Sequence, residues 1–216
     1  MQKIYTASLQ REYSMVYWFD LFGTAIFALT GLLAAKDRQL DWYGGIVLAM
    51  VTAIGGGTFR DMALGRTPVF WMMDETYFWV ILITCVVATP LVSRITAPGR
   101  WLVWSDAFGL SLFNVIGCQV ALSAGMSPLI AVFLGMATGT FGGMIRDLLV
   151  NEIPLVLRKE IYATAALIGG ITYVSLSVFL LPETLPEGVA ESASMAICFV
   201  IRVLAINKGW SLPKLR

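Results

Sequence analysis

The sequence predicts an all-α membrane protein in which seven transmembrane helices form two inverted three-helix repeats plus one C-terminal helix. The first observation is composition: 58% of the 216 residues are hydrophobic and 13% are charged, and the mean hydropathy is +0.78. Soluble domains are far less apolar than this. The second observation is an internal duplication, because Arg60-Asp61 recurs 86 positions later as Arg146-Asp147.

The duplication extends over most of the chain at this one offset. The matched residues are Trp18, Asp20, Phe22-Gly23, Phe27, Gly31, Leu48, Met50, Thr52 and Pro68, which recur as Trp104, Asp106, Phe108-Gly109, Phe113, Gly117, Leu134, Met136, Thr138 and Pro154. Chance similarity between apolar segments would not place Asp, Gly, Arg-Asp and Pro in one register. Each repeat holds three spans, and an odd number of spans inverts the second repeat in the membrane relative to the first.

The expected spans follow from the length of the apolar runs, since a helix needs about 20 apolar residues to cross a bilayer. Seven runs qualify, at roughly 15–35, 42–60, 77–95, 102–122, 128–146, 161–181 and 189–206. The breaks between them carry charge or turn signals: Lys36-Asp37-Arg38, Thr67-Pro68, Ala97-Pro98-Gly99-Arg100, Ser127-Pro128, Ile153-Pro154 and the stretch from Pro182 to Gly188.

These runs define the expected organisation of the chain. The first run is long and lacks a small-residue cleavage site, so we expect a retained helix rather than a signal peptide. We expect a single membrane domain over residues 1–216, with repeat one at about 15–95, repeat two at about 102–181 and the seventh helix at about 189–206. Pro68 and Pro154 are expected to set the turns after the second and fifth helices.

Lysine and arginine predict the orientation. If the N-terminus is outside, the outer segments hold Lys3, Arg11, Arg60 and Arg66. The inner segments then hold Lys36, Arg38, Arg94, Arg100, Arg146, Arg158, Lys159, Arg202, Lys208, Lys214 and Arg216. Because basic residues concentrate on the cytoplasmic side, we expect a multi-pass protein of a bacterial or archaeal inner (plasma) membrane, with the N-terminus outside and the C-terminus cytoplasmic.

Several function classes are disfavoured by the residues that the sequence lacks. Histidine is absent, which removes the commonest metal ligand and acid–base group. Cys85, Cys118 and Cys198 lie far apart in apolar runs and suit small hydrophobic positions. With no paired catalytic carboxylates and no nucleotide loop, the chain is not expected to be an enzyme. We also expect no cofactor, no metal site and, at a net charge of +1, no nucleic-acid partner.

Glycine clusters mark the expected pathway. They occur within the apolar runs of the second and fifth helices, and the candidate residues are Gly55, Gly56, Gly57, Thr58, Gly139, Thr140, Gly142 and Gly143. Consecutive glycines weaken a helix, and irregular backbone at membrane depth lines a wet cavity or is buried in protein. Gly135, Gly139 and Gly143 also form a small-residue packing face. We expect close packing along each helix and a break at its end.

Charged residues accompany both glycine clusters. The candidates are Asp20, Arg60 and Asp61 in repeat one and Asp106, Arg146 and Asp147 in repeat two. A charge at mid-membrane costs roughly 2.5–3.5 kcal/mol, so such residues mark a pathway or an ion pair. The repeat predicts the pairs Asp20–Arg60 and Asp106–Arg146, with Asp61 or Asp147 as the alternative partner. The other possibility is that both arginines extend to the interface.

A few further residues have structural expectations. Asn114 is expected to donate a hydrogen bond between helices. Glu191 and Arg202 in the seventh helix share one face, which suggests packing or an intersubunit contact. Trp18, Trp42, Trp101, Trp104 and Trp210 are expected to anchor the protein at the membrane interfaces.

Inverted three-helix repeats that each carry Gly-Gly-x-x-Arg-Asp, followed by a seventh helix, resemble the prokaryotic branch of the trimeric intracellular cation (TRIC) channels. The resemblance covers about residues 15–206, and that family shares a domain once described as a putative glycine transporter. It implies a homotrimer with a pore in each subunit, which conducts potassium and, less selectively, sodium. It also implies kinks at Gly55-Gly56-Gly57 and Gly142-Gly143. Phe141 stands where the first cluster has Gly55. The lysine-containing lipid motif of the animal members is not evident.

The predicted function is therefore a potassium-permeable monovalent cation channel with membrane lipid around it. Carbonyl oxygens at a helix break, where the helix dipole is negative, can replace a cation's water. The alternative is a secondary transporter of a small zwitterion such as glycine, because inverted repeats with broken helices are common in transporters.

Overall fold

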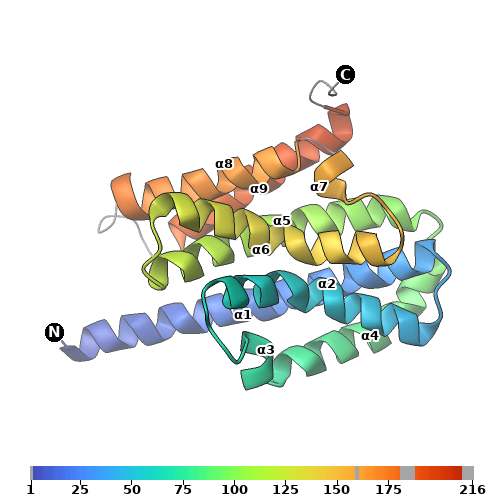
Figure 1. The fold of residues 1–216 in the computed structure, drawn as a ribbon, viewed down its shortest axis with the longest axis horizontal. Coiled ribbons are helices and arrows are strands. Elements are labelled where there is room, and N and C mark those ends of the chain that lie inside the picture. Colours follow the sequence, from blue (N-terminus) through green and yellow to red (C-terminus); the bar gives the residue numbers. More distant parts are fainter. Residues whose placement is uncertain (1, 159–160, 181–187, 211–216) are drawn as a thin grey trace.

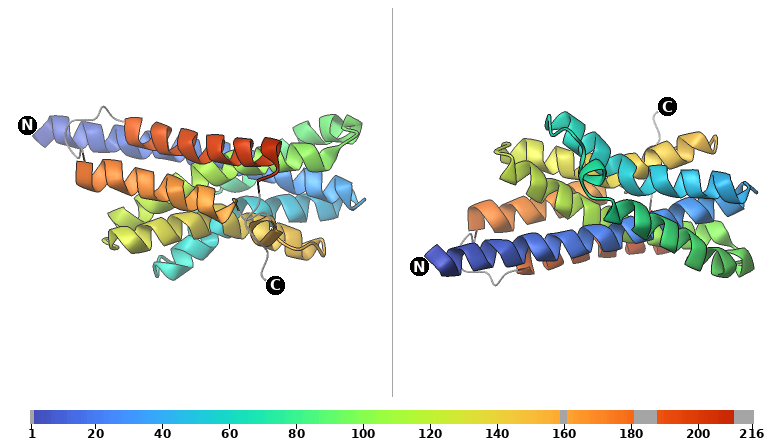
Figure 2. Two further views of the ribbon diagram at one scale, coloured as in Figure 1. Left: turned by 90° about the horizontal axis from the view of Figure 1, so that it is seen from above. Right: turned by 90° about the horizontal axis from the view of Figure 1, so that it is seen from below.

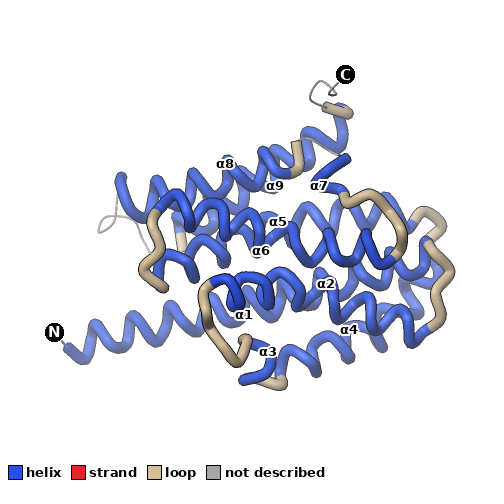
Figure 3. The backbone as a smooth tube through the Cα atoms, in the orientation of Figure 1, coloured by secondary structure: helices blue, strands red, loops and turns tan. Residues whose placement is uncertain are grey.

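Helices account for all the regular secondary structure in residues 2–158, 161–180 and 188–210, which the computed structural model describes (Figures 1 and 3). The elements are α1 (Gln2–Asp37), α2 (Trp42–Ala63), α3 (Phe70–Met73), α4 (Thr76–Arg94), α5 (Pro98–Ser123), α6 (Pro128–Leu149), α7 (Leu155–Arg158), α8 (Ala163–Val174) and α9 (Val189–Lys208). A π-helix at Ser175–Leu180 continues α8.

The apolar helices of the described residues confirm the predicted all-α membrane fold. Six of them are long and apolar enough to cross a membrane, and a seventh apolar helix, Ala163–Phe179, is shorter. The first apolar span, Val16–Asp37, agrees with the predicted start near residue 15, although α1 itself begins at Gln2. Helix α5 begins at Pro98 rather than residue 102. Residues 182–187 of the predicted turn lie outside the described residues.

The two repeats pack against each other through their matched helices. Helices α1, α2 and α4 belong to repeat one, and α5, α6 and α8 to repeat two. Helix α1 contacts α5, and α2 contacts α6, whereas α9 contacts α8 and α5. Figure 1 shows α4 on one side of these four central helices and the α8–α9 pair on the other. Two further views show α9 lying along α8 (Figure 2).

Matched capping residues begin the second helix of each repeat. Asp41 accepts a hydrogen bond from the Gly44 amide at the start of α2, and Ser127 accepts one from the Ile130 amide at the start of α6. Asp41 and Ser127 occupy corresponding positions of the duplication. A capping side chain satisfies one of the free amides at a helix start, so the two repeats begin these helices in the same way despite different residue types.

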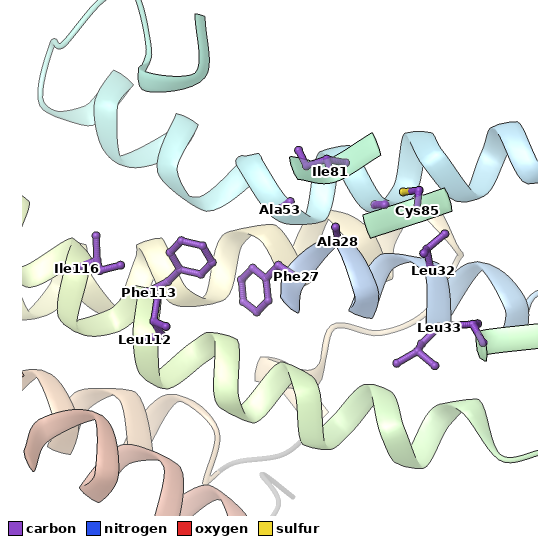
Figure 4. Close-up of a cluster of buried hydrophobic side chains, with 12 residues drawn as sticks. Phe27, Ala28, Leu32, Leu33, Ala53, Ile81, Cys85, Leu112, Phe113 and Ile116 are labelled. Carbon is purple, nitrogen blue, oxygen red and sulfur yellow. The ribbon is translucent and has the colours of Figure 1, made fainter. Parts of the chain in front are cut away.

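The core lies where the repeats meet. The rings of Phe27 and Phe113, corresponding residues, have centroids 5.0 Å apart and belong to a cluster of buried side chains (Figure 4). Gly109 faces the Phe27 ring, and Gly23 faces the Phe113 ring, so that a Cβ at either glycine would collide with the ring opposite. This reciprocal arrangement is the contact expected from a pseudo-two-fold axis between duplicated halves.

Candidate functional site

Two matched glycines let α2 and α6 cross at close range. Gly56 lies against the carbonyl of Thr138, and Gly142 lies against the carbonyl of Thr52, so that a Cβ at either glycine would overlap a backbone oxygen. Each of these pairs is the image of the other in the duplication. The packing role predicted for the glycine clusters is therefore present, because only a residue without a side chain permits this separation.

The predicted helix breaks are absent, and that expectation was wrong. Helix α2 runs without interruption from Trp42 to Ala63 and α6 from Pro128 to Leu149. Glycine lowers helix propensity by roughly 1 kcal/mol per residue, but an unpaired backbone group in a membrane costs several kcal/mol. The close contact between the two helices adds packing that the propensity argument leaves out.

The other residues of the glycine clusters face neighbouring elements. A Cβ at Gly55 would lie 3.4 Å from the Gly142 Cα, and one at Gly57 would lie 2.5 Å from the Phe70 ring. Gly139 faces the Leu110 carbonyl on α5, where an added Cβ would approach to 2.9 Å. Gly143 faces the charged residues described below. The clusters therefore serve contacts with several helices rather than one open backbone segment.

The threonines of the clusters bond to their own helices. Thr58 Oγ1 donates to the Ile54 carbonyl at 2.7 Å and accepts from Trp71 Nε1 at 3.1 Å. Thr140 Oγ1 donates to the Ala137 carbonyl at 3.3 Å. Such bonds within a helix satisfy the hydroxyl donor, and Thr58 in addition joins α2 to α3 through Trp71.

Phe59 of α2 and Phe141 of α6 stack beside the glycine contact. Their ring centroids are 3.8 Å apart, with planes at 18° to each other. One sequence feature could have indicated this pair, since Phe141 departs from the repeat by standing where the first cluster has Gly55. The stack joins the two helices near the level of their closest approach.

Arg146 forms the centre of a buried ionic cluster in repeat two. Arg146 Nη1 donates to Asp106 Oδ1 at 2.9 Å, and both side chains are fully buried. Arg146 Nε and Nη2 lie 2.9 and 2.8 Å from Asp147 Oδ1. The structure thus contains the predicted Asp106–Arg146 pair. The second oxygen of Asp147 accepts from the Leu155 amide at 2.9 Å, which fixes the start of α7.

In repeat one the arginine again contacts the aspartate that follows it, but the ion pair with the aspartate of the first helix is missing among the described contacts. Arg60 donates to Asp61 Oδ1 at 2.8 Å, and Asp61 Oδ2 accepts from the Phe70 amide at 2.9 Å. The predicted Asp20–Arg60 ion pair is wrong: among the described contacts, Asp20 instead accepts a hydrogen bond from the Tyr77 hydroxyl at 2.9 Å. The guanidinium of Arg60 lies 5.5 Å from the centroid of the Phe70 ring.

The two repeats share a tyrosine at this aspartate and differ at the arginine. Tyr77 donates to Asp20, and the Tyr162 hydroxyl likewise bonds Asp106. Phe70, on which Arg60 lies, takes the place of Leu155, because the amides of these two residues bond the matched carboxylates of Asp61 and Asp147. The alternative that the arginines extend to the interface does not hold, since Arg60 is 4% exposed and Arg146 is 0% exposed.

An acidic residue outside the spans joins the repeat-one end. Asp74 lies between α3 and α4, and its oxygens accept from the Thr76 amide at 2.9 Å and from the Tyr17 hydroxyl at 2.7 Å. A hydrogen bond from the Thr76 side chain, with the Thr76 amide and Tyr17, holds the pKa of Asp74 below its usual range. This carboxylate therefore stays charged at neutral pH.

Asn114 and Arg202 lie outside the glycine and charge motifs and also make buried contacts near the site. Asn114 Nδ2 donates to the Ala166 carbonyl at 2.9 Å, which confirms the predicted hydrogen bond between helices. Arg202 of α9 is 1% exposed and lies 4.5 Å above the Tyr162 ring. The packing role considered for Arg202 is therefore present. Tyr162 was not singled out from the sequence, because an offset of 86 residues pairs it with Thr76, whereas in the structure it takes the place of Tyr77.

The charged groups do not suggest a metal centre, and the tryptophans are largely exposed. Within the described part of the chain, no group of three or more acidic or cysteine side chains is placed to hold a metal ion. Trp18, Trp42, Trp101 and Trp210 are 66%, 58%, 61% and 47% exposed, as interface anchors would be. Trp104 is half-buried.

Comparison with protein families finds one matching model, described as glycine transporter, over residues 17–92 and 103–177. These two ranges correspond to the two repeats. A UPF0126 membrane protein of Vibrio cholerae is 52% identical over 201 residues, which are 93% of this chain and 82% of the relative. The UPF0126 inner membrane protein YadS of Escherichia coli is 43% identical over 200 residues, 92% of this chain and 95% of the relative.

Solved structures agree with these sequence matches. The TRIC trimeric intracellular cation channel orthologue from Rhodobacter sphaeroides is 42% identical with a TM-score of 0.86, covering 91% of this chain and all (100%) of that one.

Proposed function

Because the chain belongs to the prokaryotic branch of the TRIC channel family, we propose that it is a potassium-permeable monovalent cation channel. The observation that carries this proposal is the likeness to the Rhodobacter sphaeroides channel at 42% identity and a TM-score of 0.86. By the same likeness, the protein assembles as a homotrimer with one pore in each subunit. Sodium passes less selectively, and membrane lipid surrounds the trimer.

The proposed pathway runs along the crossing of α2 and α6. In the structure the helices touch through Gly56 and Gly142, which corresponds to a closed pathway. Separation of the helices at these glycines would open it and would free one lone pair on the carbonyls of Thr52 and Thr138 for a cation. Carbonyl oxygens replace the hydration shell of potassium in the selective sites of channels.

The buried charges suit a cation path because the arginine of each Arg-Asp motif is neutralised. Arg146 contacts Asp106 and Asp147, and Arg60 contacts Asp61. An uncompensated arginine would repel a cation in a medium of low dielectric constant. The neighbouring carboxylates remove that barrier and leave lone pairs that face a passing ion.

We place the channel in the inner membrane with its N-terminus outside and its C-terminus in the cytoplasm. The support is the excess of lysine and arginine on the inner side of the predicted spans. The Escherichia coli relative is itself an inner membrane protein.

A secondary transporter of a small zwitterion such as glycine is the alternative. The observation that favours it is the matching family model, which is described as glycine transporter. A carboxylate and an arginine side by side, as in the Asp106–Arg146 pair, could also hold the two charged ends of an amino acid.

Electrical recording separates the two functions. Purified protein is incorporated into planar lipid bilayers with potassium chloride on both sides, and glycine uptake is measured in matched proteoliposomes. A channel gives unitary potassium currents that do not depend on glycine. Saturable glycine uptake without unitary currents would reject the channel and support the transporter.

A further inference from the structure

The two charged clusters have the same formal charge before their surroundings are included. The repeat-one cluster consists of Asp20, Arg60 and Asp61, and the repeat-two cluster consists of Asp106, Arg146 and Asp147. Each combines one arginine with two carboxylates, for a formal charge of −1. Inverted repeats place the two clusters toward opposite sides of the membrane. If nothing else contributed, a cation would meet equivalent charge at both ends of its path.

Helix α9 adds a second arginine to the repeat-two cluster. Arg202 lies 4.5 Å above the Tyr162 ring. The Tyr162 hydroxyl, Asp106 Oδ1 and Arg146 Nη2 converge on Gly143, at 3.7, 3.2 and 3.5 Å from the position of a Cβ there. One tyrosine ring therefore separates the second guanidinium from the cluster. With Arg202 the formal charge at this end rises from −1 to 0.

The charge of Arg202 is buried and incompletely paired. Its side chain is 1% exposed, and among the described residues its Nε and Nη2 atoms have no hydrogen-bond partner. The face of the Tyr162 ring attracts the guanidinium but carries no negative charge. Because screening by salt and water is weak for buried charges, the positive field of Arg202 reaches the Asp106 carboxylate through the ring.

Repeat one has no counterpart of this arginine. Helix α9 approaches α8 at Gly169, where an added Cβ would lie 2.8 Å from the Cβ of Cys198, one turn before Arg202. Among the described elements, α4 contacts α1, α2 and α3, and no helix takes the place of α9 beside it. The repeat-one end instead gains the nearby carboxylate of Asp74, which Tyr17 links to the ring of Tyr77.

We infer that Arg202 makes the two ends of the cation pathway unequal in charge, so that potassium enters more readily at the repeat-one end and the channel rectifies. This inference rests on the proposed channel function. A negative entrance raises the local concentration of cations, whereas a neutral entrance does not. The seventh helix lies outside the duplication. Its arginine therefore makes the current through two matched halves larger in one direction than in the other.

The test measures unitary currents of the purified trimer in bilayers with the same potassium chloride solution on both sides. The ratio of the currents at equal positive and negative voltage is expected to be about twofold or more in the wild type, given the usual strength of electrostatic steering. Arg202→Gln should bring the ratio close to one by raising the smaller current. Asp20→Asn should bring it close to one by lowering the larger current.

Two control variants distinguish charge from packing. Arg202→Lys keeps the positive charge and should keep the ratio, although it loses the planar guanidinium. Glu191→Gln changes the charge of α9 by one unit of the opposite sign, far from the cluster, and should also keep the ratio. An unchanged ratio in Arg202→Gln overturns the inference. If that variant does not assemble, an unchanged ratio in Asp20→Asn overturns it equally.

The outcomes also separate the inference from the function on which it rests. Wild-type unitary potassium currents of equal size in both directions would overturn the role of Arg202 and leave the channel in place. The absence of unitary currents in well-assembled wild-type protein would remove the proposed function and the inference with it.

Discussion

The contacts of Arg146 show how a buried charge is stabilised inside this membrane protein. The guanidinium donates to one carboxylate from α5 and one from its own helix, all within 3 Å. Charges taken out of water are stable only when such contacts offset the loss of hydration. Arg60 reaches the same result differently, through Asp61 and the face of the Phe70 ring.

The Asp106–Arg146 pair should show strong coupling in a double-mutant cycle. Loss of one partner leaves the other charge buried and should destabilise the protein by about 3–5 kcal/mol. Asp106→Ala, Arg146→Ala and the double variant are compared by unfolding of the purified trimer, and the coupling should exceed about 1 kcal/mol. The same cycle on Asp20 and Arg60 is the matched control and should give weaker coupling, because these side chains have other partners. Equal coupling in both cycles would contradict the structure.

The glycines at the helix crossing should tolerate no side chain. Gly56→Ala and Gly142→Ala each place a Cβ against a backbone carbonyl, which cannot move without shifting a helix, so each should cost about 1–3 kcal/mol. Gly99→Ala is the control, since nothing lies within 4 Å of its added Cβ. Thermal unfolding of the three variants checks this. A Gly142→Ala protein as stable as Gly99→Ala would show that the helices can separate at little cost.

At the scale of elements, the seventh helix determines how the two repeats differ. Helix α9 covers α8, whereas no described helix covers the outer face of α4, where Ile83, Val87 and Leu91 are 59%, 68% and 66% exposed. The same contrast appears at Gly169, a residue small enough for α9 to pack closely. One added helix thus converts two nearly equivalent halves into two different environments.

Enlarging Gly169 should loosen α9 from α8. Gly169→Leu forces a side chain toward Cys198, whose thiol is fully buried, and should make that thiol reactive toward a maleimide. Ile83→Leu is the control, because Ile83 is exposed and Cys85 on the same helix should stay protected. Mass spectrometry of the labelled cysteines distinguishes the two. Protection of Cys198 in Gly169→Leu would mean that α8 and α9 adapt as a unit.

At the scale of the whole molecule, duplication and membrane insertion account for the architecture. Two three-helix repeats meet at Phe27 and Phe113, and the matched helices of each repeat contact each other. The chain belongs to a channel family, which agrees with the expectation that it is not an enzyme.

The orientation of the whole molecule is open to a direct test. The basic residues of the predicted inner segments should place the C-terminus in the cytoplasm. Fluorescent protein fused after Arg216 should therefore fluoresce, and alkaline phosphatase fused there should be inactive. The opposite pattern would reverse the predicted orientation and would exchange the sides on which the two charged clusters lie.

The sequence by itself determined the duplication, the apolar spans and the positions of the buried charges. These features depend on residue type and spacing, which a constant offset of 86 positions reveals without any coordinates. It also predicted the Asp106–Arg146 pair and the hydrogen bond of Asn114, because these partners follow from the repeat or from an amide among apolar residues.

Only the tertiary structure decided the partners that lie outside the repeat. Asp20 bonds to Tyr77 rather than Arg60, and Arg202 reaches the repeat-two cluster through Tyr162. The two tyrosines are 85 residues apart, so the constant offset of 86 does not pair them. The glycines proved to be contacts rather than breaks, since helix packing and the demand for backbone hydrogen bonds in lipid outweigh a local propensity. Partner choice depends on distances between helices, and spacing along the chain does not specify those.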